Sequence, residues 1–195
     1  MNLYTIQNFD AIVELLTTGK FFCDPEKSPN LSNEDKDISA VFKRAYNWLV
    51  PKIKEKIGAP RKGIKYPVWA WYANEDSSID WRKGAGEVGE IMYRIDFIMD
   101  EKDVIATDFE KWHAVIGDCI LTNNEDEYHY WSTLNKKERE SYKRKTWNRI
   151  FTIEKDSVCQ YNFWELDYKN VINITPFVVP DDDDEDEEEE IKKDA

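Results

Sequence analysis

Cysteine and histidine are scarce in this sequence, which has three cysteines and two histidines among its 195 residues. It contains no CxxC or HExxH motif, and a structural zinc ion needs four nitrogen or sulfur ligands, so we predict no metal site. The odd number of cysteines, without paired spacing, argues against a disulfide framework and predicts free thiols in a reducing compartment.

Long apolar runs and a secretory leader are also missing. No segment has the run of about 18 apolar residues that would cross a bilayer. The first ten residues do not combine a basic segment with a following apolar one, as a signal peptide does. We therefore expect a cytoplasmic protein that makes no use of a membrane.

Negative charge is concentrated at the C-terminus. The net charge is −13 at pH 7, and residues 181–195 alone hold eleven acidic residues and two lysines. Consecutive carboxylates repel one another and bury no apolar face, so we predict a globular domain over residues 1–178 and a disordered acidic tail over 179–195. The tail either keeps the protein soluble or binds a basic protein partner, as a mimic of DNA would. Direct nucleic-acid binding is not expected, because the basic residues of the domain gather mainly in 136–149, where two glutamates interrupt them.

Aromatic residues are abundant, with eight Trp, ten Tyr and nine Phe, and such a chain can form a core. Helical spacing of apolar residues predicts helices over residues 9–16, 41–49, 109–120 and 136–147. Alternation and β-branched or aromatic runs predict strands over residues 3–6, 66–72, 91–99, 104–106, 150–153, 158–166 and 171–179. This mixture predicts an α+β fold. We expect a single domain with a mostly antiparallel sheet, continuous or split, and with N-terminal and flanking helices.

Three local signals refine these boundaries. Gly19 is expected to cap the first helix, and Pro51 to end or bend the second. Thr107 and Glu110 fit a capping box that would open the third helix. Residues 84–89 (GAGEVG) match GxGxxG, but a dinucleotide site needs a strand before the pattern and a helix after it, so we interpret this segment as a loop between strands.

Aromatic and basic residues in the middle of the chain are candidates for ligand binding. Trp69 and Trp71 alternate along a predicted strand, so both indoles point to one face, where they either belong to the core or stack on a flat ligand ring. Arg82 follows in a polar loop, either as a solvated side chain or as a contact for an anionic group.

The later part of the chain holds the candidates for acid–base chemistry. His113 follows Asp108 by five residues on a predicted helix, and is either satisfied by a neighbour or faces a cleft as acid, base or donor. Gln160 shares a predicted strand face with Asn162 and Trp164, and this row either faces solvent or lines a ligand pocket.

Several sequence blocks occur in a characteristic order: LYTIQ at residues 3–7, PVWAWY at 67–72, DWR at 80–82, DFEKWHAVI at 108–116 and CQYNFWEL at 159–166. In these blocks the chain, from residue 1 to about 178, resembles the bacterial and phage family called domain of unknown function 3841. The resemblance implies no activity, so it groups the chain without giving a mechanism.

The layout is more distantly similar to that of ADP-ribosyltransferase-like folds, which bind NAD in the cleft of a split sheet. This resemblance implies that Tyr4 and Thr5 of the first strand, and Trp71 or Tyr72 of the middle strand, bind the ligand. It places Gln160 where these enzymes carry a late-strand glutamate or glutamine. The first strand here has no Arg or His, and an amide cannot stabilise positive charge on a ribose as a glutamate does.

These residues support three functional hypotheses. An ADP-ribosyltransferase-like enzyme acting on a nucleotide, with NAD as the candidate cofactor, would use Gln160, His113 and Asp108 for catalysis. Its ligand-binding residues would be Tyr4, Thr5, Trp71, Tyr72, Arg82 and Trp164. The alternatives are a non-catalytic acidic interaction or inhibitor protein of phage or mobile-element origin, and a sensor that binds a small ligand with the same aromatic residues.

Overall fold

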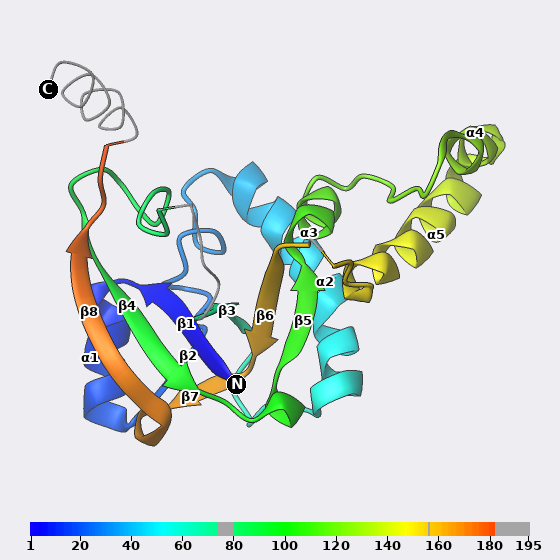
Figure 1. Ribbon diagram of the computed structural model, residues 1–195. Helices are drawn as coiled ribbons and strands as arrows, with labels where there is room; N and C mark the ends of the chain where they lie inside the picture. The colour runs from blue at the N-terminus through cyan, green and yellow to red at the C-terminus, as the bar shows by residue number, and fades with distance from the viewer. Residues whose placement is uncertain (74–79, 156, 182–195) are drawn as a thin grey trace, which may run out of the picture. The chain divides into compact units, whose positions relative to one another are not determined.

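The computed structural model describes residues 1–73, 80–155 and 157–181 (Figure 1). The strands are β1 (Asn2–Gln7), β2 (Lys20–Phe22), β3 (Val68–Tyr72), β4 (Ile91–Ile98), β5 (Ile105–Asp108), β6 (Cys159–Phe163), β7 (Glu165–Asp167) and β8 (Val171–Val178). The α-helices are α1 (Phe9–Thr18), α2 (Lys36–Ile57), α3 (Phe109–Ile116), α4 (Glu125–Thr133) and α5 (Lys136–Thr146). Short 3-10 helices are η1 (Glu101–Asp103), η2 (Trp147–Phe151) and η3 (Tyr168–Asn170).

The elements form an α+β fold with a mostly antiparallel sheet, which confirms the predicted fold class. The larger sheet has the strand order β5-β6-β3-β1-β4-β8, and β2 pairs with β7. None of the helices in the described ranges combines the length and apolar character that a membrane crossing requires. The acidic tail predicted over 179–195 lies, beyond residue 181, outside the described residues.

Contacts between residues divide the chain into two compact units. The first unit contains Met1–Phe21, Ala70–Met99 and Leu166–Ala195, and the second contains Phe22–Trp69 and Asp100–Glu165. Each unit therefore combines segments that are far apart in the sequence.

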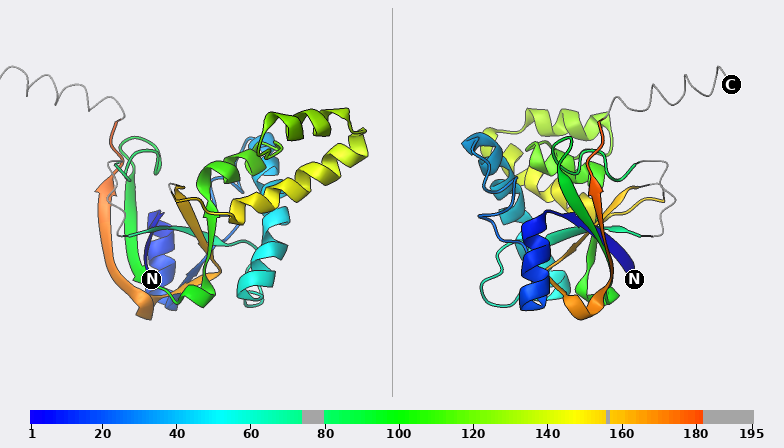
Figure 2. Two further views of the ribbon diagram at one scale, coloured as in Figure 1. Left: turned by 45° about the vertical axis from the view of Figure 1, so that its right-hand side comes forward. Right: turned by 90° about the vertical axis from the view of Figure 1, so that its left-hand side faces the viewer.

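In the first unit, β1 lies between β3 and β4, and β8 follows β4 at the edge of the sheet. One face of this sheet buries Leu3, Ile95 and Phe97. Helix α1 lies against that face (Figures 1 and 2). The helix begins where the Asn8 side chain accepts a hydrogen bond from the Ala11 backbone, and it ends at Gly19, as predicted.

In the second unit, α2, α3 and η2 enclose a core that is rich in aromatic rings. Tyr46 lies 5.5 Å from Trp112, between ring centroids, and Trp147 is fully buried. Helix α2 does not end at Pro51 but continues to Ile57. Ile53, beyond the proline, is fully buried, so the packing of this last stretch outweighs the hydrogen bond that proline cannot make.

Two predictions about α3 are wrong. The cap is the Asp108 carboxylate, which accepts from the Lys111 backbone, because the Thr107 hydroxyl is used instead by the neighbouring strand. The helix also stops at Ile116 rather than at residue 120, since Gly117 follows and Asp118 adopts a left-handed backbone with φ 56°.

Two further differences concern the region around α5. Residues 150–153 are predicted as a strand, but the first two belong to η2 and the other two to no strand, because a short apolar run does not distinguish a strand from a buried helical turn. Helix α4 was not predicted, since none of its residues is buried and its sequence shows no apolar periodicity. It pairs with α5 as a helical hairpin (Figures 1 and 2).

Candidate functional site

The first unit carries an aromatic surface on the sheet face opposite to α1. Tyr4 in β1 lies directly opposite both Trp71 in β3 and Asp96 in β4. Residues directly opposite each other in neighbouring strands point to the same face, so these three share one face. Leu3 and its partner Tyr72 belong to the other.

Arg94 lies in the middle of this surface. Its guanidinium carbon is 3.9 Å from the centroid of the Tyr4 ring and 4.9 Å from that of the Trp81 ring. Its Nε and Nη2 donate to Asp96 Oδ1 at 2.9 and 2.8 Å. Only 18% of the Arg94 side chain is exposed. Nη1 has no hydrogen-bond partner among the described residues.

Trp81 connects this arginine to the edge strand β8. Its ring meets Phe177 edge-on, with 4.8 Å between centroids, and lies 6.4 Å from the Tyr4 ring. Rings placed over a guanidinium attract it electrostatically, so the stack stabilises Arg94 in one position. We refer to Tyr4, Trp71, Trp81, Arg94 and Phe177 as the aromatic face.

The structure brings two of the predicted ligand-binding residues, Tyr4 and Trp71, into this aromatic face. Thr5 does not belong to it, because its side chain is 2% exposed on the opposite side of β1. Tyr72 also lies on that opposite side. Arg82, in the loop after β3, is held by Asp80 at 2.6 to 3.0 Å. The hydrogen bonds from Arg82 lower the pKa of the Asp80 carboxyl.

In the second unit, Gln160 lies within a buried polar group on β5 and β6. The Thr107 hydroxyl donates to the backbone carbonyl of Gln160 at 3.1 Å and accepts from Asn162 Nδ2 at 3.0 Å. All three residues are at most 1% exposed. Gln160 Nε2 and Asn162 Oδ1 have no hydrogen-bond partner among the residues that the structure describes. The Gln160 amide is therefore buried rather than presented to solvent.

Asp108 is strongly engaged at the start of α3. Its carboxylate accepts from the Lys111 backbone at 3.0 Å and from the Ser157 hydroxyl at 2.8 Å, and it lies 3.0 Å from Lys111 Nζ. Burial alone would raise the pKa of Asp108, but these hydrogen bonds and the lysine charge together lower it. A carboxylate with these contacts stays ionised and fixes the helix start.

The remaining two candidates of the second unit, His113 and Trp164, lie in different surroundings. His113 is exposed, and its ring meets that of Phe109 edge-on, with 4.3 Å between centroids. Trp164 is 8% exposed, and its Nε1 donates to the Gly58 carbonyl at 2.9 Å within the hydrophobic core. Its contacts are those of a core tryptophan whose polar atom is satisfied.

Sequence reasoning missed Arg94 and Trp81. The signal was present, because Arg94 and Asp96 are charged residues two positions apart in a strand that is otherwise apolar. Such a pair lies on one strand face and can form an ion pair there. Among the described residues, no group of histidine, cysteine, aspartate and glutamate is arranged to hold a metal ion.

The comparisons with known proteins identify a family but no function. A family model described as "Domain of unknown function (DUF3841)" matches residues 2–172. No curated protein and no solved structure matches the chain.

Proposed function

This chain belongs to the family of domain of unknown function 3841, and we propose that its aromatic face binds a small anionic ligand with a flat ring, a nucleotide such as NAD. The position of Arg94 supports this most directly. A cation whose Nη1 has no hydrogen-bond partner in the described part of the chain lies beside the rings of Tyr4 and Trp81. Flat rings bind on aromatic side chains, and a guanidinium is suited to phosphate, so the face offers both contacts at one place.

The proposed binding concerns the first unit alone. Tyr4 and Trp71 would stack against the base or the nicotinamide ring, and Arg94 would contact the phosphate through Nη1. Asp96 holds the other side of the guanidinium, so the arginine is oriented before the ligand arrives. An oriented binding group loses little conformational freedom on binding, which favours affinity.

Titration calorimetry with NAD, ADP-ribose and AMP tests this function. Arg94→Lys keeps the charge but loses the planar fork, and we expect it to weaken binding roughly tenfold, the equivalent of one charged hydrogen bond. Trp71→Leu should weaken binding as well. Arg82→Lys is the matched control, because Arg82 is a loop arginine already paired with Asp80. Binding that depends on Arg82 and not on Arg94 would contradict the proposal, and so would the absence of heat with all three ligands.

The catalytic roles of Gln160, His113 and Asp108 stay predictions of the distant resemblance. The contacts of Asp108 favour a structural role, and Gln160 is buried. We therefore propose ligand binding, as in a small-ligand sensor, without a reaction.

An interaction protein is the second candidate function. The charge of the C-terminus supports it, since ten consecutive carboxylates run from residue 181 to 190. A basic protein partner would bind this segment electrostatically and be released by salt. Replacing the ten carboxylates with amides should abolish capture of a basic protein such as a histone mixture at low salt. Capture that persists would show that the segment only adds solubility.

A cytoplasmic location is proposed from the thiols. Cys23, Cys119 and Cys159 form no disulfide bond with one another. Burial raises the pKa of the Cys23 thiol to about 12, and the negative charge of Asp24 adds to this effect. The thiol therefore stays protonated and unreactive. Labelling with a thiol reagent in the native state should modify Cys119, which is exposed, before the other two.

A further inference from the structure

The structure divides the basic residues of 136–149 into two kinds. Three of these cations are held by the protein itself. Arg139 donates to the carbonyls of Leu134 and Ser132, Lys143 is paired with Asp118 and Glu140, and Arg149 is paired with Glu127. Arg139 and Lys143 lie on the side of α5 that packs against the rest of the second unit, and Arg149 follows the helix in η2.

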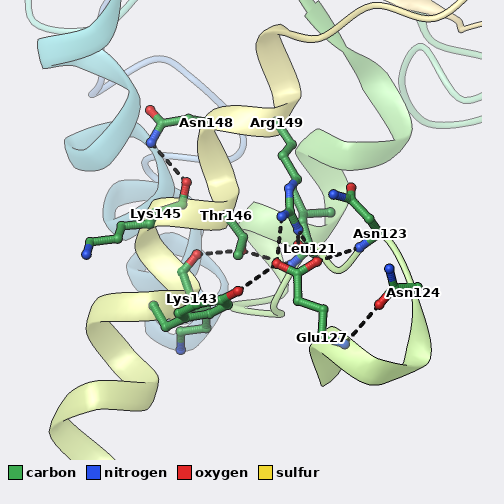
Figure 3. A network of polar contacts seen from close by, with 10 residues as sticks. Leu121, Asn123, Asn124, Glu127, Lys143, Lys145, Thr146, Asn148 and Arg149 are labelled. Carbon is green, nitrogen blue, oxygen red and sulfur yellow. Dashed lines mark hydrogen bonds and ion pairs between the residues drawn. The ribbon is translucent and has the colours of Figure 1, made fainter. Parts of the chain in front are cut away.

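The other four cations are exposed and have no ion-pair partner within the described ranges: Lys136, Lys137, Arg144 and Lys145. The Arg144 guanidinium carbon lies 5.8 Å from the centroid of the Trp147 ring. At about 100° per residue, the four lie in one half of the helix circumference, away from Tyr142 and Thr146. We refer to these four residues as the basic stripe. Lys145 extends away from the Glu127–Arg149 network (Figure 3).

The two glutamates of α5 do not cancel this stripe. Glu138 accepts from the Asn135 backbone in the capping box, and Glu140 lies 3.0 Å from Lys143 Nζ. Glu140 and Ser141 are the other residues of this half of the helix, so the stripe includes no large apolar side chain, and Glu140 is the carboxylate already paired with Lys143. A protein interface has an apolar core, whereas phosphate binding requires only charge, and this favours a nucleic acid as the partner.

We propose that the basic stripe of α5 binds the phosphate backbone of a nucleic acid. The two ends of the stripe, Lys136–Lys137 and Arg144–Lys145, are about 12 Å apart along the helix at 1.5 Å per residue. That distance corresponds to roughly three or four nucleotides of one strand at about 3.4 Å each, so both pairs can contact one backbone. The net charge of −13 opposes the approach of a polyanion, so we expect this binding to be weak and steeply dependent on salt.

Fluorescence anisotropy with a labelled 20-base-pair duplex and the full chain tests the proposal, with salt varied upward from about 20 mM. In the stripe variant, all four residues are changed to Gln. In the control variant, Lys43, Lys54, Lys62 and Lys65 are changed to Gln; these lysines are exposed, unpaired within the described residues and contribute the same charge. Circular dichroism checks that both variants stay folded.

The intact chain is expected to bind the duplex with an affinity that falls steeply as salt rises. The stripe variant should lower the slope of log affinity against log salt by roughly 3 to 4, since each lost phosphate contact removes about 0.9. The control variant should keep most of the slope. Equal loss in both variants would overturn the proposal, because general charge would then account for binding. Stronger competition by polyglutamate than by unlabelled duplex would also overturn it and point to an acidic protein.

Discussion

Glu127 and Arg149 are joined by two hydrogen bonds of 2.6 and 2.9 Å, although they lie 22 residues apart (Figure 3). The pair links α4 to η2, and Arg149 also donates to the Leu121 carbonyl. Tyr142 and the Asn123 backbone donate to the same carboxylate. Only 13% of the Glu127 side chain is exposed. The hairpin of α4 and α5 buries little apolar surface through α4, so this network is a main reason why it keeps its position.

Glu127→Gln should therefore destabilise the second unit. The amide cannot accept from both guanidinium nitrogens, and its own NH2 group would face Arg149. We expect a loss of about 2 kcal/mol in the free energy of unfolding, the range for hydrogen bonds to charged groups. Urea unfolding followed by circular dichroism measures it. Glu125→Gln, in the exposed first turn of α4, is the control and should change stability little. Equal stability of the two variants would mean that the pair contributes nothing.

The Glu127 carboxylate should also make the free energy of unfolding depend on pH. Hydrogen bonds from Arg149 lower the pKa of Glu127 from 4.5 to about 2, although burial opposes them. Because the folded-state pKa is depressed, the stabilisation is fully present above pH 4.5 and is lost as the pH falls toward 2. The difference in unfolding free energy between the intact chain and Glu127→Gln should be constant from pH 7 to 5 and shrink below 4.5. A difference that disappears already between pH 7 and 5 would contradict this assignment.

The fold was predictable wherever the periodicity of the sequence was strong. The strands containing Tyr4 and Arg94 alternate, and the Gly19 cap adopts φ 76°, which glycine adopts without steric cost. Residues 150–153 and α4 were not predictable, because tertiary packing decides the conformation of a short apolar run, and polar capping defines the start of α4 at Asn124.

The candidate site was predictable only in part. Alternation was enough to place Trp71 on a strand face, but which residue of β1 lies opposite depends on the register, and the register is a tertiary property. The sequence pointed to Arg82 as the cation, because it stands beside an aromatic residue in a polar loop. The structure pairs it with Asp80 and gives Arg94, from a strand, the position among the rings.

Thr107→Val tests the buried polar group of β5 and β6. Valine has nearly the same shape but removes the hydroxyl that Asn162 Nδ2 and the Gln160 carbonyl use. Among the described residues, Asn162 Nδ2 would keep only its long contact of 3.5 Å with the Gln160 backbone carbonyl. A buried donor left poorly paired costs about 1 to 3 kcal/mol, so we expect a loss of that size in urea unfolding. Thr107→Ser, which keeps the hydroxyl, should lose less.

Gln160→Met is the companion variant. It removes an amide whose Nε2 already lacks a partner within the described residues, and methionine fills a similar volume. Its stability should stay within about 1 kcal/mol of the intact chain or rise. A loss as large as that of Thr107→Val would show that the Gln160 amide has a partner, such as an ordered water, and that the polar group is larger than these three residues.

Two variants of Asp108 test whether this carboxylate caps helix α3 or acts as a catalytic group. Asp108→Ala removes the acceptor for the Lys111 backbone and the Ser157 hydroxyl, and a lost N-cap costs about 0.5 to 2 kcal/mol. Asp108→Asn keeps an oxygen for the cap and loses only the charge beside Lys111 Nζ, so it should be clearly more stable than the alanine variant. Hydrogen exchange localises the effect, since the amides of residues 109–112 at the start of α3 should exchange faster in the alanine variant than in the asparagine variant. If these amides exchange at the same rate in both variants and in the intact chain, the carboxylate does not hold the helix start, and its role in proton transfer becomes the better hypothesis.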